Sequence, residues 1–214
     1  MLRDTGERLE LVPQGPKAPG AVAVDFGNAA MRRRRRGGHN EPLGRAVGVG
    51  KWSPLRLVDA TAGLGRDSFV LADLGCQVIM LERVAVVHAL LADGLRRALA
   101  SEDPWLQAAA SRLSLLGADA EDWLTREHPE PVDVIYLDPM FPARTKSARV
   151  KKEMWLFQEL LESQESGALL EPALALARRR VVVKRPARAP SLENRAPSFT
   201  IPGKTVRFDV YQVS

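Results

Sequence analysis

The chain has 214 residues, 45% of them hydrophobic and 27% charged, which is the balance of a globular protein and excludes a disordered or fibrous one. A single cysteine, Cys76, excludes an internal disulfide framework and a zinc site built on several cysteines. No stretch reaches the roughly 18 unbroken apolar residues of a membrane helix, and the acidic amino terminus does not resemble a secretory signal. We therefore expect a soluble protein of a reducing compartment, the cytoplasm.

Positive charge is concentrated in three segments of the chain. The net charge is only +5, but residues 31–51, 142–152 and 178–188 hold 18 of the 31 lysines and arginines, and the remainder of the chain is acidic. A single charge run is as often a solvated face as a binding site. If the three segments meet in space, they form a surface for a polyanion, and we expect that polyanion to be a nucleic acid.

The first 50 residues are expected to form an amino-terminal extension. Residues 1–20 are polar and rich in proline and glycine, which predicts a loose lead-in. Residues 21–26 predict a short strand, and the arginine run at 32–36 and a glycine-rich stretch follow it. We place the main domain at residues 51–214.

From residue 51 onward, short apolar runs alternate with segments of helical period. Continuous apolar runs are typical of parallel strands that helices cover on both faces. The predicted strands are 56–60, 77–81, 112–116, 133–137 and 180–184, and the predicted helices are 66–74, 84–100, 120–126, 150–161 and 169–177. A last run at 205–213 alternates polar and apolar residues, which predicts an antiparallel strand at the sheet edge. This order predicts an α/β fold with a Rossmann-like, mostly parallel sheet between two layers of helices.

A glycine turn follows the first strand of the main domain. Asp59, Gly63 and Gly65 frame this turn, and glycine lets the backbone approach a ligand closely. Glu82 and Asp119 follow the next two strands, and an acid at the tip of the second strand is well placed to bind the ribose hydroxyls of an adenosine group. One acid at a strand end is more often a helix cap. Three in succession beside a glycine turn predict a site for an adenosyl ligand.

The stretch after the fourth strand is the most informative in the chain. Asp138 and the carbonyl of Pro139 can accept the two N–H bonds of an exocyclic base amine and stabilise the charge that develops as the amine attacks a methyl group. Phe141 can stack on the base, a contact worth about 1–3 kcal/mol. Asp-Pro alone is compatible with a simple turn. With Phe141 and the upstream glycine turn, it predicts methyl transfer to a base amine, with these three residues as the catalytic candidates.

Five sequence strings together resemble the ribosomal RNA small subunit methyltransferase J family. They are VDATAGLGRD, MLER, YLDPMFP, KSARVKKEM and RRVVVKRP, and the resemblance spans about residues 20–212. It implies a class I enzyme that uses S-adenosylmethionine to methylate the N2 amine of one guanine in 16S ribosomal RNA, without a metal. It also implies that the cofactor contacts fall, besides the turn residues, on Arg66, Asp67, Glu82, Arg83, Asp119, Ala120 and Asp138.

The basic segments would then position a small-subunit RNA or ribosomal particle by its phosphates while the pocket reads the base. The candidates for these RNA contacts are Arg32, Arg33, Arg34, Arg35, Arg36, Arg144, Lys146, Lys151, Lys152, Lys184 and Arg185. Three other functions stay open. One is methylation of adenine N6 or cytosine N4 in RNA or DNA, and another is a non-catalytic RNA-binding factor of ribosome assembly. The third is a nicotinamide-dependent oxidoreductase, although the chain lacks the G-x-G-x-x-G turn.

Overall fold

The structure is a computed structural model that describes residues 1–15, 18, 20–38, 41–52, 54–126, 132–139 and 168–213. The predicted helix at 150–161 lies outside these ranges, as do five candidate site residues, Phe141, Arg144, Lys146, Lys151 and Lys152. Within the described ranges, every helix is too short or too polar to cross a membrane.

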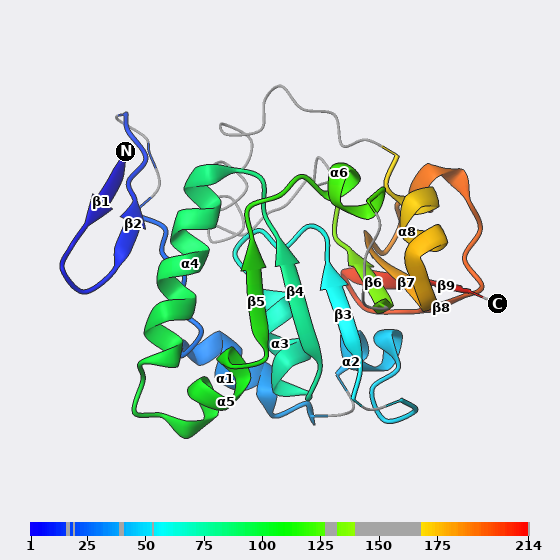
Figure 1. Ribbon diagram of the computed structural model, residues 1–214, viewed down its shortest axis with the longest axis horizontal. Helices are drawn as coiled ribbons and strands as arrows, with labels where there is room; N and C mark the ends of the chain where they lie inside the picture. Colours follow the sequence, from blue (N-terminus) through cyan, green and yellow to red (C-terminus); the bar gives the residue numbers. More distant parts are fainter. Residues whose placement is uncertain are drawn as a thin grey trace.

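A seven-stranded sheet forms the centre of the molecule (Figure 1). The strands are β3 (Arg56–Asp59), β4 (Gln77–Leu81), β5 (Leu113–Leu116), β6 (Val132–Leu137), β7 (Ala177–Pro186), β8 (Phe199–Ile201) and β9 (Val206–Gln212). Their order in space is β5-β4-β3-β6-β7-β9-β8, in which the first five are parallel and β9 and β8 are antiparallel to their neighbours. The predicted mostly parallel, Rossmann-like sheet is confirmed.

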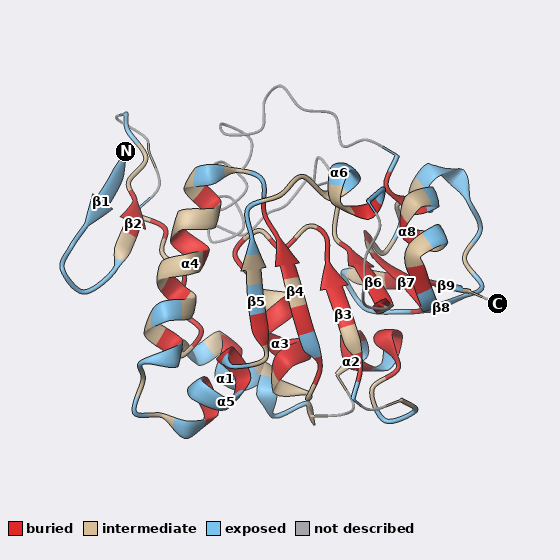
Figure 2. Cartoon of the chain, in the orientation of Figure 1, coloured by how far each residue is buried: buried red, intermediate tan, exposed pale blue. Residues whose placement is uncertain are grey.

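Helices cover both faces of this sheet because its side chains alternate between two apolar clusters. Leu57 of β3 belongs to one cluster and Val58 to the other. In the described part of the chain, five helices pack on the first face: α1 (Ala29–Arg35), α2 (Pro42–Val47), α3 (Arg66–Asp73), α4 (Ala85–Leu99) and α5 (Pro104–Ala110). On the second lie α6 (Ala120–Leu124) and α8 (Leu170–Leu176). Figure 2 shows the buried strands between helices whose outer sides are exposed.

The sheet order places a crevice at the carboxyl end of β3. The connection from β3 leads to β4 on one side, whereas β6 and β7 lie on its other side. Ligands of open α/β sheets bind where the strand order reverses in this way, because the loops diverge there. The residues that follow β3, β4 and β6 therefore meet at one edge of the sheet.

The amino-terminal region differs from its prediction. Residues 1–20 are not a loose lead-in, since β1 (Leu2–Asp4) and β2 (Leu9–Leu11) pair as an antiparallel hairpin beside α4. Residues 21–26 form a single bridge, Leu11 with Val22, in place of the predicted strand. Their alternating apolar side chains are nevertheless buried, and they join the same cluster as Leu57. The core therefore contains residues from both sides of residue 50.

The carboxyl-terminal strand also lies elsewhere than predicted. The alternation at 205–213 does form an antiparallel strand, β9, but β9 lies between β7 and β8 and is not the edge strand. The short β8 takes the edge. The prediction was wrong because three residues, Phe199–Ile201, are too few to produce a recognisable period.

Candidate functional site

A cavity of about 690 Å3 opens at the carboxyl ends of β3, β4 and β6. Its volume lies within the range of about 300–1,000 Å3 that is usual for small-molecule and cofactor sites. Most of the predicted cofactor and catalytic residues line it: Asp59, Gly63, Arg66, Asp67, Glu82, Arg83, Asp119, Ala120, Asp138 and Pro139. Arg34 and Lys184, which were predicted to contact phosphates, line it as well.

The glycine turn requires its glycines. Gly63 and Gly65 have φ angles of 53° and 70°, in the left-handed region that favours glycine. A Cβ atom on Gly65 would also lie 2.6 Å from Leu91 Cδ1 and 3.2 Å from Phe26 Cζ. Gly65 does not line the cavity. As the N-cap residue of α3, it turns the chain so that the first residues of that helix line the cavity.

Glu82 connects the tip of β4 to the glycine turn. Its carboxylate accepts hydrogen bonds from the backbone N–H groups of Val84, at 2.7 Å, and Gly63. Only 9% of the residue is exposed, and this burial raises the pKa of its carboxyl against the effect of the hydrogen bonds. The residue thus presents an acceptor group to the cavity at the place expected for a ribose contact.

Asp119 acts as a helix cap and also lies in the cavity wall. One carboxylate oxygen accepts from the backbone N–H groups of Glu121 and Asp122 in the first turn of α6. The other accepts from Arg83 Nη1 at 2.8 Å. Burial opposes ionisation, but these hydrogen bonds prevail and lower the pKa of Asp119. Asp119 is therefore a helix cap that also lines the cavity, and its contact with a cofactor stays a prediction.

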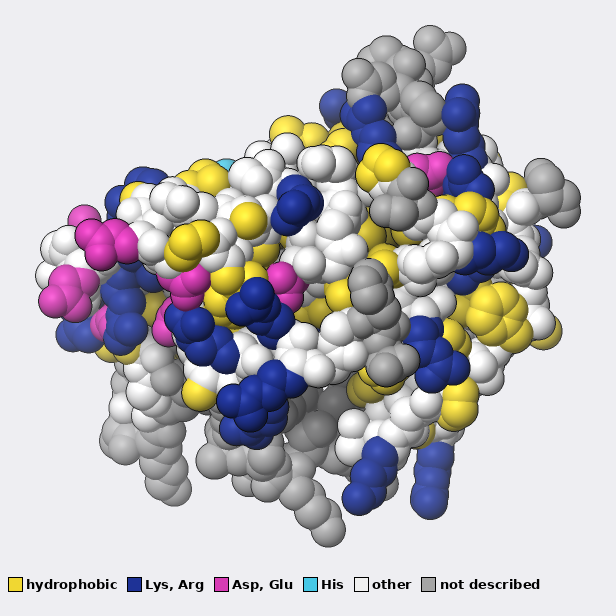
Figure 3. Space-filling model, turned by 90° about the horizontal axis from the view of Figure 1, so that it is seen from below, with side chains coloured by type: hydrophobic (Ala, Val, Ile, Leu, Met, Phe, Trp, Pro, Cys, Tyr) yellow, Lys and Arg dark blue, Asp and Glu magenta, His cyan; other side chains and the backbone are white. Residues whose placement is uncertain are grey.

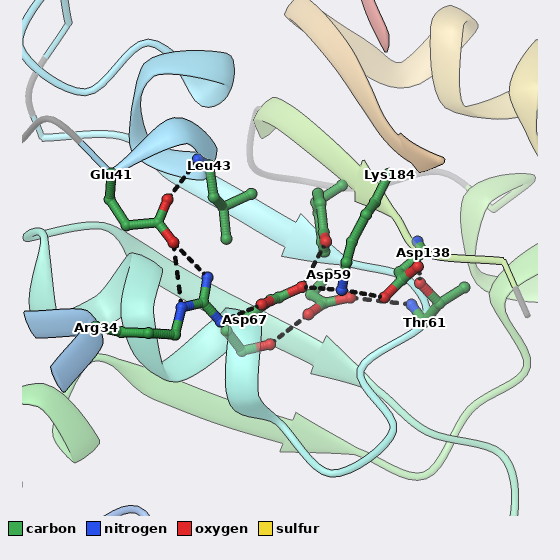
Figure 4. Close-up of polar contacts among 10 residues, drawn as sticks. Arg34, Glu41, Leu43, Asp59, Thr61, Asp67, Asp138 and Lys184 are labelled. Carbon is green, nitrogen blue, oxygen red and sulfur yellow. Dashed lines mark hydrogen bonds and ion pairs between the residues drawn. The ribbon is translucent and has the colours of Figure 1, made fainter. Parts of the chain in front are cut away.

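Asp67 is the centre of a network of charged groups beside the cavity (Figure 4). Its Oδ1 accepts from Arg34 Nη1 at 2.6 Å, and its Oδ2 accepts from the Tyr136 hydroxyl at 2.7 Å and from Lys184 Nζ at 2.8 Å. Although burial would raise it, the pKa of Asp67 is held well below its usual range by Lys184 and Arg34. The same contacts raise the pKa of Lys184 despite its burial. Both groups are therefore charged at neutral pH.

Asp138 is fixed from two directions. Lys184 Nζ donates to its Oδ2 at 2.7 Å, and its backbone N–H donates to Thr61 Oγ1 at 2.6 Å. The Asp138 side chain is 38% exposed. Since Asp138 and Gly63 line one cavity, the tip of β6 and the glycine turn face the same space.

Asp59 is buried beneath this network. It is 1% exposed and accepts hydrogen bonds from the Ser68 hydroxyl and the Thr61 backbone N–H. Burial raises the pKa of its carboxyl to about 7, and the negative charge of Asp67 adds to this effect. The geometry gives Asp59 the role of a support for the turn.

The members of the arginine run have different surroundings, because a helix turns successive side chains to different sides. Arg34 points to the cavity, while Arg32 and Arg35 lie over the Trp105 ring at 5.1 and 5.0 Å. Arg33 and Arg36 are exposed and have no ion-pair partner among the described residues. In the view from below, Figure 3, basic side chains are spread over the surface rather than gathered in one patch.

Arg185 is a correction to the predicted set of RNA contacts. It is 1% exposed, and its Nε and Nη2 atoms donate to the Pro190 carbonyl at 3.0 and 2.6 Å. A guanidinium group that is buried in this way stabilises the loop after β7 and is not available to a phosphate.

Sequence reasoning missed three features of the site. The sequence predicts phosphate contacts for Arg34 and Lys184, and it indicates no role for the Tyr136 hydroxyl. Lys184 had a usable signal, since a single lysine at the carboxyl end of the apolar run VVVKRP lies where site residues of parallel sheets gather. Arg34 had no such signal, because it stands among four other arginines in the run at 32–36.

Comparison with known proteins places this chain in a family. A family model described as a putative SAM-dependent methyltransferase matches residues 1–213. Two similar proteins are both named ribosomal RNA small subunit methyltransferase J. The one from Thioalkalivibrio sulfidiphilus is 54% identical over 96% of this chain and 82% of its own length, and the one from Pseudomonas aeruginosa is 49% identical over 96% and 79%.

Solved structures agree with the fold. A SAM-dependent methyltransferase from Neisseria gonorrhoeae has a TM-score of 0.73 and 36% identity, and the match covers 96% of this chain and 79% of that one. The rRNA methyltransferase AviRa from Streptomyces viridochromogenes, at 16% identity and a TM-score of 0.53 over 94% and 88% of the two chains, shares the fold alone.

Proposed function

The chain belongs to the SAM-dependent methyltransferase family that includes the ribosomal RNA small subunit methyltransferases J. We propose that it transfers a methyl group from S-adenosylmethionine to the N2 amine of a guanine in small-subunit ribosomal RNA. One observation carries the proposal. A single cavity joins the glycine turn, which suits a nucleoside cofactor, to the Asp138–Pro139 acceptors, which suit a base amine.

The residues of the cavity fit S-adenosylmethionine, which supplies a methyl group on a sulfonium and thus needs no activation by the protein. Glu82 would offer a carboxylate to the ribose hydroxyls. Arg83, Asp119 and Ala120, which line the same cavity, would contact the adenine. The first turn of α3 has a glycine N-cap and no side-chain cap. Its N–H groups attract a carboxylate such as that of the methionine moiety.

On the acceptor side, Asp138 and the Pro139 carbonyl accept the N–H bonds of the base amine and orient its nitrogen toward the methyl group. Fixed acceptors stabilise the positive charge that develops on the nitrogen, because they need no reorganisation during the reaction. Lys184 and the backbone contact to Thr61 keep Asp138 in place before the substrate arrives. Phe141, which lies outside the described residues, is proposed to stack on the base.

RNA phosphates bind to the exposed arginines of α1 in this proposal. The basic residues at 144–152, which lie outside the described residues, are also proposed to bind phosphates. Base edges in an RNA duplex are hard to reach, so the target guanine lies in a loop or is flipped out. We place the reaction in the cytoplasm, where ribosomal RNA of this kind is made.

Replacement of Asp138 by alanine tests the proposal. We expect kcat for methyl transfer to small-subunit RNA to fall at least ~100-fold, because an acceptor of the attacking amine is lost. The affinity for S-adenosylhomocysteine, measured by calorimetry, should change much less. Glu171→Gln removes an exposed carboxylate that pairs with Arg195 among the described residues, and it serves as the charge-matched control. Near-normal turnover of Asp138→Ala would contradict the mechanism, and binding of RNA without any transfer by the wild type would favour a non-catalytic factor.

A further inference from the structure

Arg34 is the one residue of the arginine run that points into the cavity wall while its neighbours face outward. Its Nε and Nη2 atoms donate to Glu41 Oε1 at 3.1 and 2.6 Å, and its Nη1 donates to Asp67 Oδ1 at 2.6 Å. The Glu41 carboxylate also accepts from the Leu43 backbone N–H at the start of α2. Arg34 thus joins α1 to the first turns of α2 and α3 (Figure 4).

Asp67 connects Arg34 to residues on the opposite side of the cavity. Its two oxygens are shared between Arg34 on one side and Lys184 with the Tyr136 hydroxyl on the other. The Asp67 side chain is only 13% exposed, so water is a poor substitute for either cation. Loss of Arg34 leaves an underneutralised carboxylate that draws Lys184 toward itself.

Lys184 is shared between two carboxylates. Its Nζ atom lies 2.8 Å from Asp67 and 2.7 Å from Asp138, and its side chain is 25% exposed. The position of the ammonium group between them depends on how well each carboxylate is neutralised by other groups. A change at Arg34 therefore alters the contact that holds Asp138.

The same helix carries the exposed arginines that the proposed function assigns to RNA. Arg33 precedes Arg34 and is exposed, and Arg32 and Arg35 are held by Trp105 on the outer side. Any shift of α1 on contact with a phosphate backbone moves Arg34 relative to Asp67.

We propose that Arg34 is a positioning residue, which through Asp67 and Lys184 fixes Asp138 and so links RNA contact at α1 to the geometry of methyl transfer. The inference rests on the proposed function of Asp138 and adds a role that the arginine run was not expected to have. Arg34 does not touch the reacting atoms. Its effect is on orientation, where a displacement of about 1 Å can cost ~100-fold in rate.

Kinetics of matched arginine variants test this role. Arg34→Gln should lower kcat by about 10- to 100-fold, with KM for the RNA and the affinity for S-adenosylhomocysteine changed less than about threefold. Arg33→Gln, one residue away, should show the reverse pattern, a raised KM at unchanged kcat. Arg34→Lys keeps a charge facing Asp67 and should recover part of kcat. Arg96→Gln, an exposed arginine on α4, is the control for loss of one charge.

A second readout needs neither cofactor nor RNA. The side-chain ammonium of Lys184, observed by 15N NMR and assigned with Lys184→Arg, should shift or broaden in Arg34→Gln and stay unchanged in Arg96→Gln. Melting temperatures show whether the variants are folded. If Arg34→Gln is not folded, the same measurements are made on Arg34→Lys.

The inference would be overturned if Arg34→Gln left the Lys184 ammonium resonance and kcat unchanged and only raised KM for the RNA. Arg34 would then be an RNA contact. Absence of methyl transfer by the wild type would instead contradict the proposed function, while the resonance would still decide the positioning role.

Discussion

Asp59 shows how burial changes a single carboxyl group. It is 1% exposed, it is held by the Ser68 hydroxyl and a backbone N–H, and burial raises its pKa to about 7. In the unfolded chain an aspartate titrates near its ordinary value, about 3.9. The folded state thus binds more protons than the unfolded state between about pH 4 and pH 7, and this group makes the protein less stable as the pH rises through that window.

Substitution of Asp59 by asparagine should remove this dependence, because the amide does not titrate. We expect the free energy of unfolding of Asp59→Asn, relative to that of the wild type, to increase between pH 5 and pH 7 by at most about 1.4 kcal/mol per pH unit. Urea unfolding of both proteins at several pH values measures it, since the titrations of all other groups cancel in the difference. A difference that does not vary with pH would show that Asp59 is ionised throughout.

At the scale of elements, the contact of α4 with residues 21–26 depends on a glycine. A Cβ atom on Gly94 would lie 2.6 Å from Val24 Cβ and 3.2 Å from the Val24 carbonyl oxygen. In an isolated helix, alanine is about 1 kcal/mol more favourable than glycine. Overpacking of a tight contact costs about 1–3 kcal/mol, so the two effects oppose each other.

We expect Gly94→Ala to destabilise the protein by about 1 kcal/mol or more, because the added Cβ atom would overlap with both backbone and side-chain atoms of Val24. Thermal or urea unfolding measures the change. Val24→Ala combined with Gly94→Ala should be less destabilised than the sum of the single changes, since the smaller side chain relieves part of the overlap. A Gly94→Ala protein that is more stable than the wild type would show that the helix moves away from Val24 at little cost.

The sequence predicted the parallel strands because each is a continuous apolar run. The predicted strand at 77–81 coincides with β4, and that at 56–60 exceeds β3 by one residue. The helix α1 was missed because four arginines give it no apolar period, although Asn28 caps it. The hairpin β1–β2 was missed because strands of three residues carry almost no pattern.

The acids of the site could be predicted for a related reason. Carboxyl ends of parallel strands meet, so Asp59, Glu82 and Asp138 had to lie near one another once the strands were assigned. The direction of a long side chain such as Arg34 or Lys184 depends on packing between distant elements. It therefore had to come from the structure.

Across the whole molecule, the basic residues of the segment at 178–188 are divided between the two ends of the sheet. The segment at 178–188 spans β7, so that Lys184 lies at the cavity end of the sheet and Arg179 and Arg180 lie at the other, beside the Trp52 ring at 4.9 and 4.4 Å. The run at 32–36 borders the cavity through Arg34. The segment at 142–152 lies outside the described residues. RNA contact near the site is therefore assigned first to α1.

The central claim is that the cavity delivers a methyl group to the N2 amine of a guanine in small-subunit RNA. The direct test is incubation of small-subunit particles, and of their free RNA, with S-adenosylmethionine that carries a CD3 group, followed by nucleoside mass spectrometry. We expect a single labelled product, N2-methylguanosine, which is absent with Asp138→Ala. Label in adenosine or cytidine, or no label in either substrate, would contradict it.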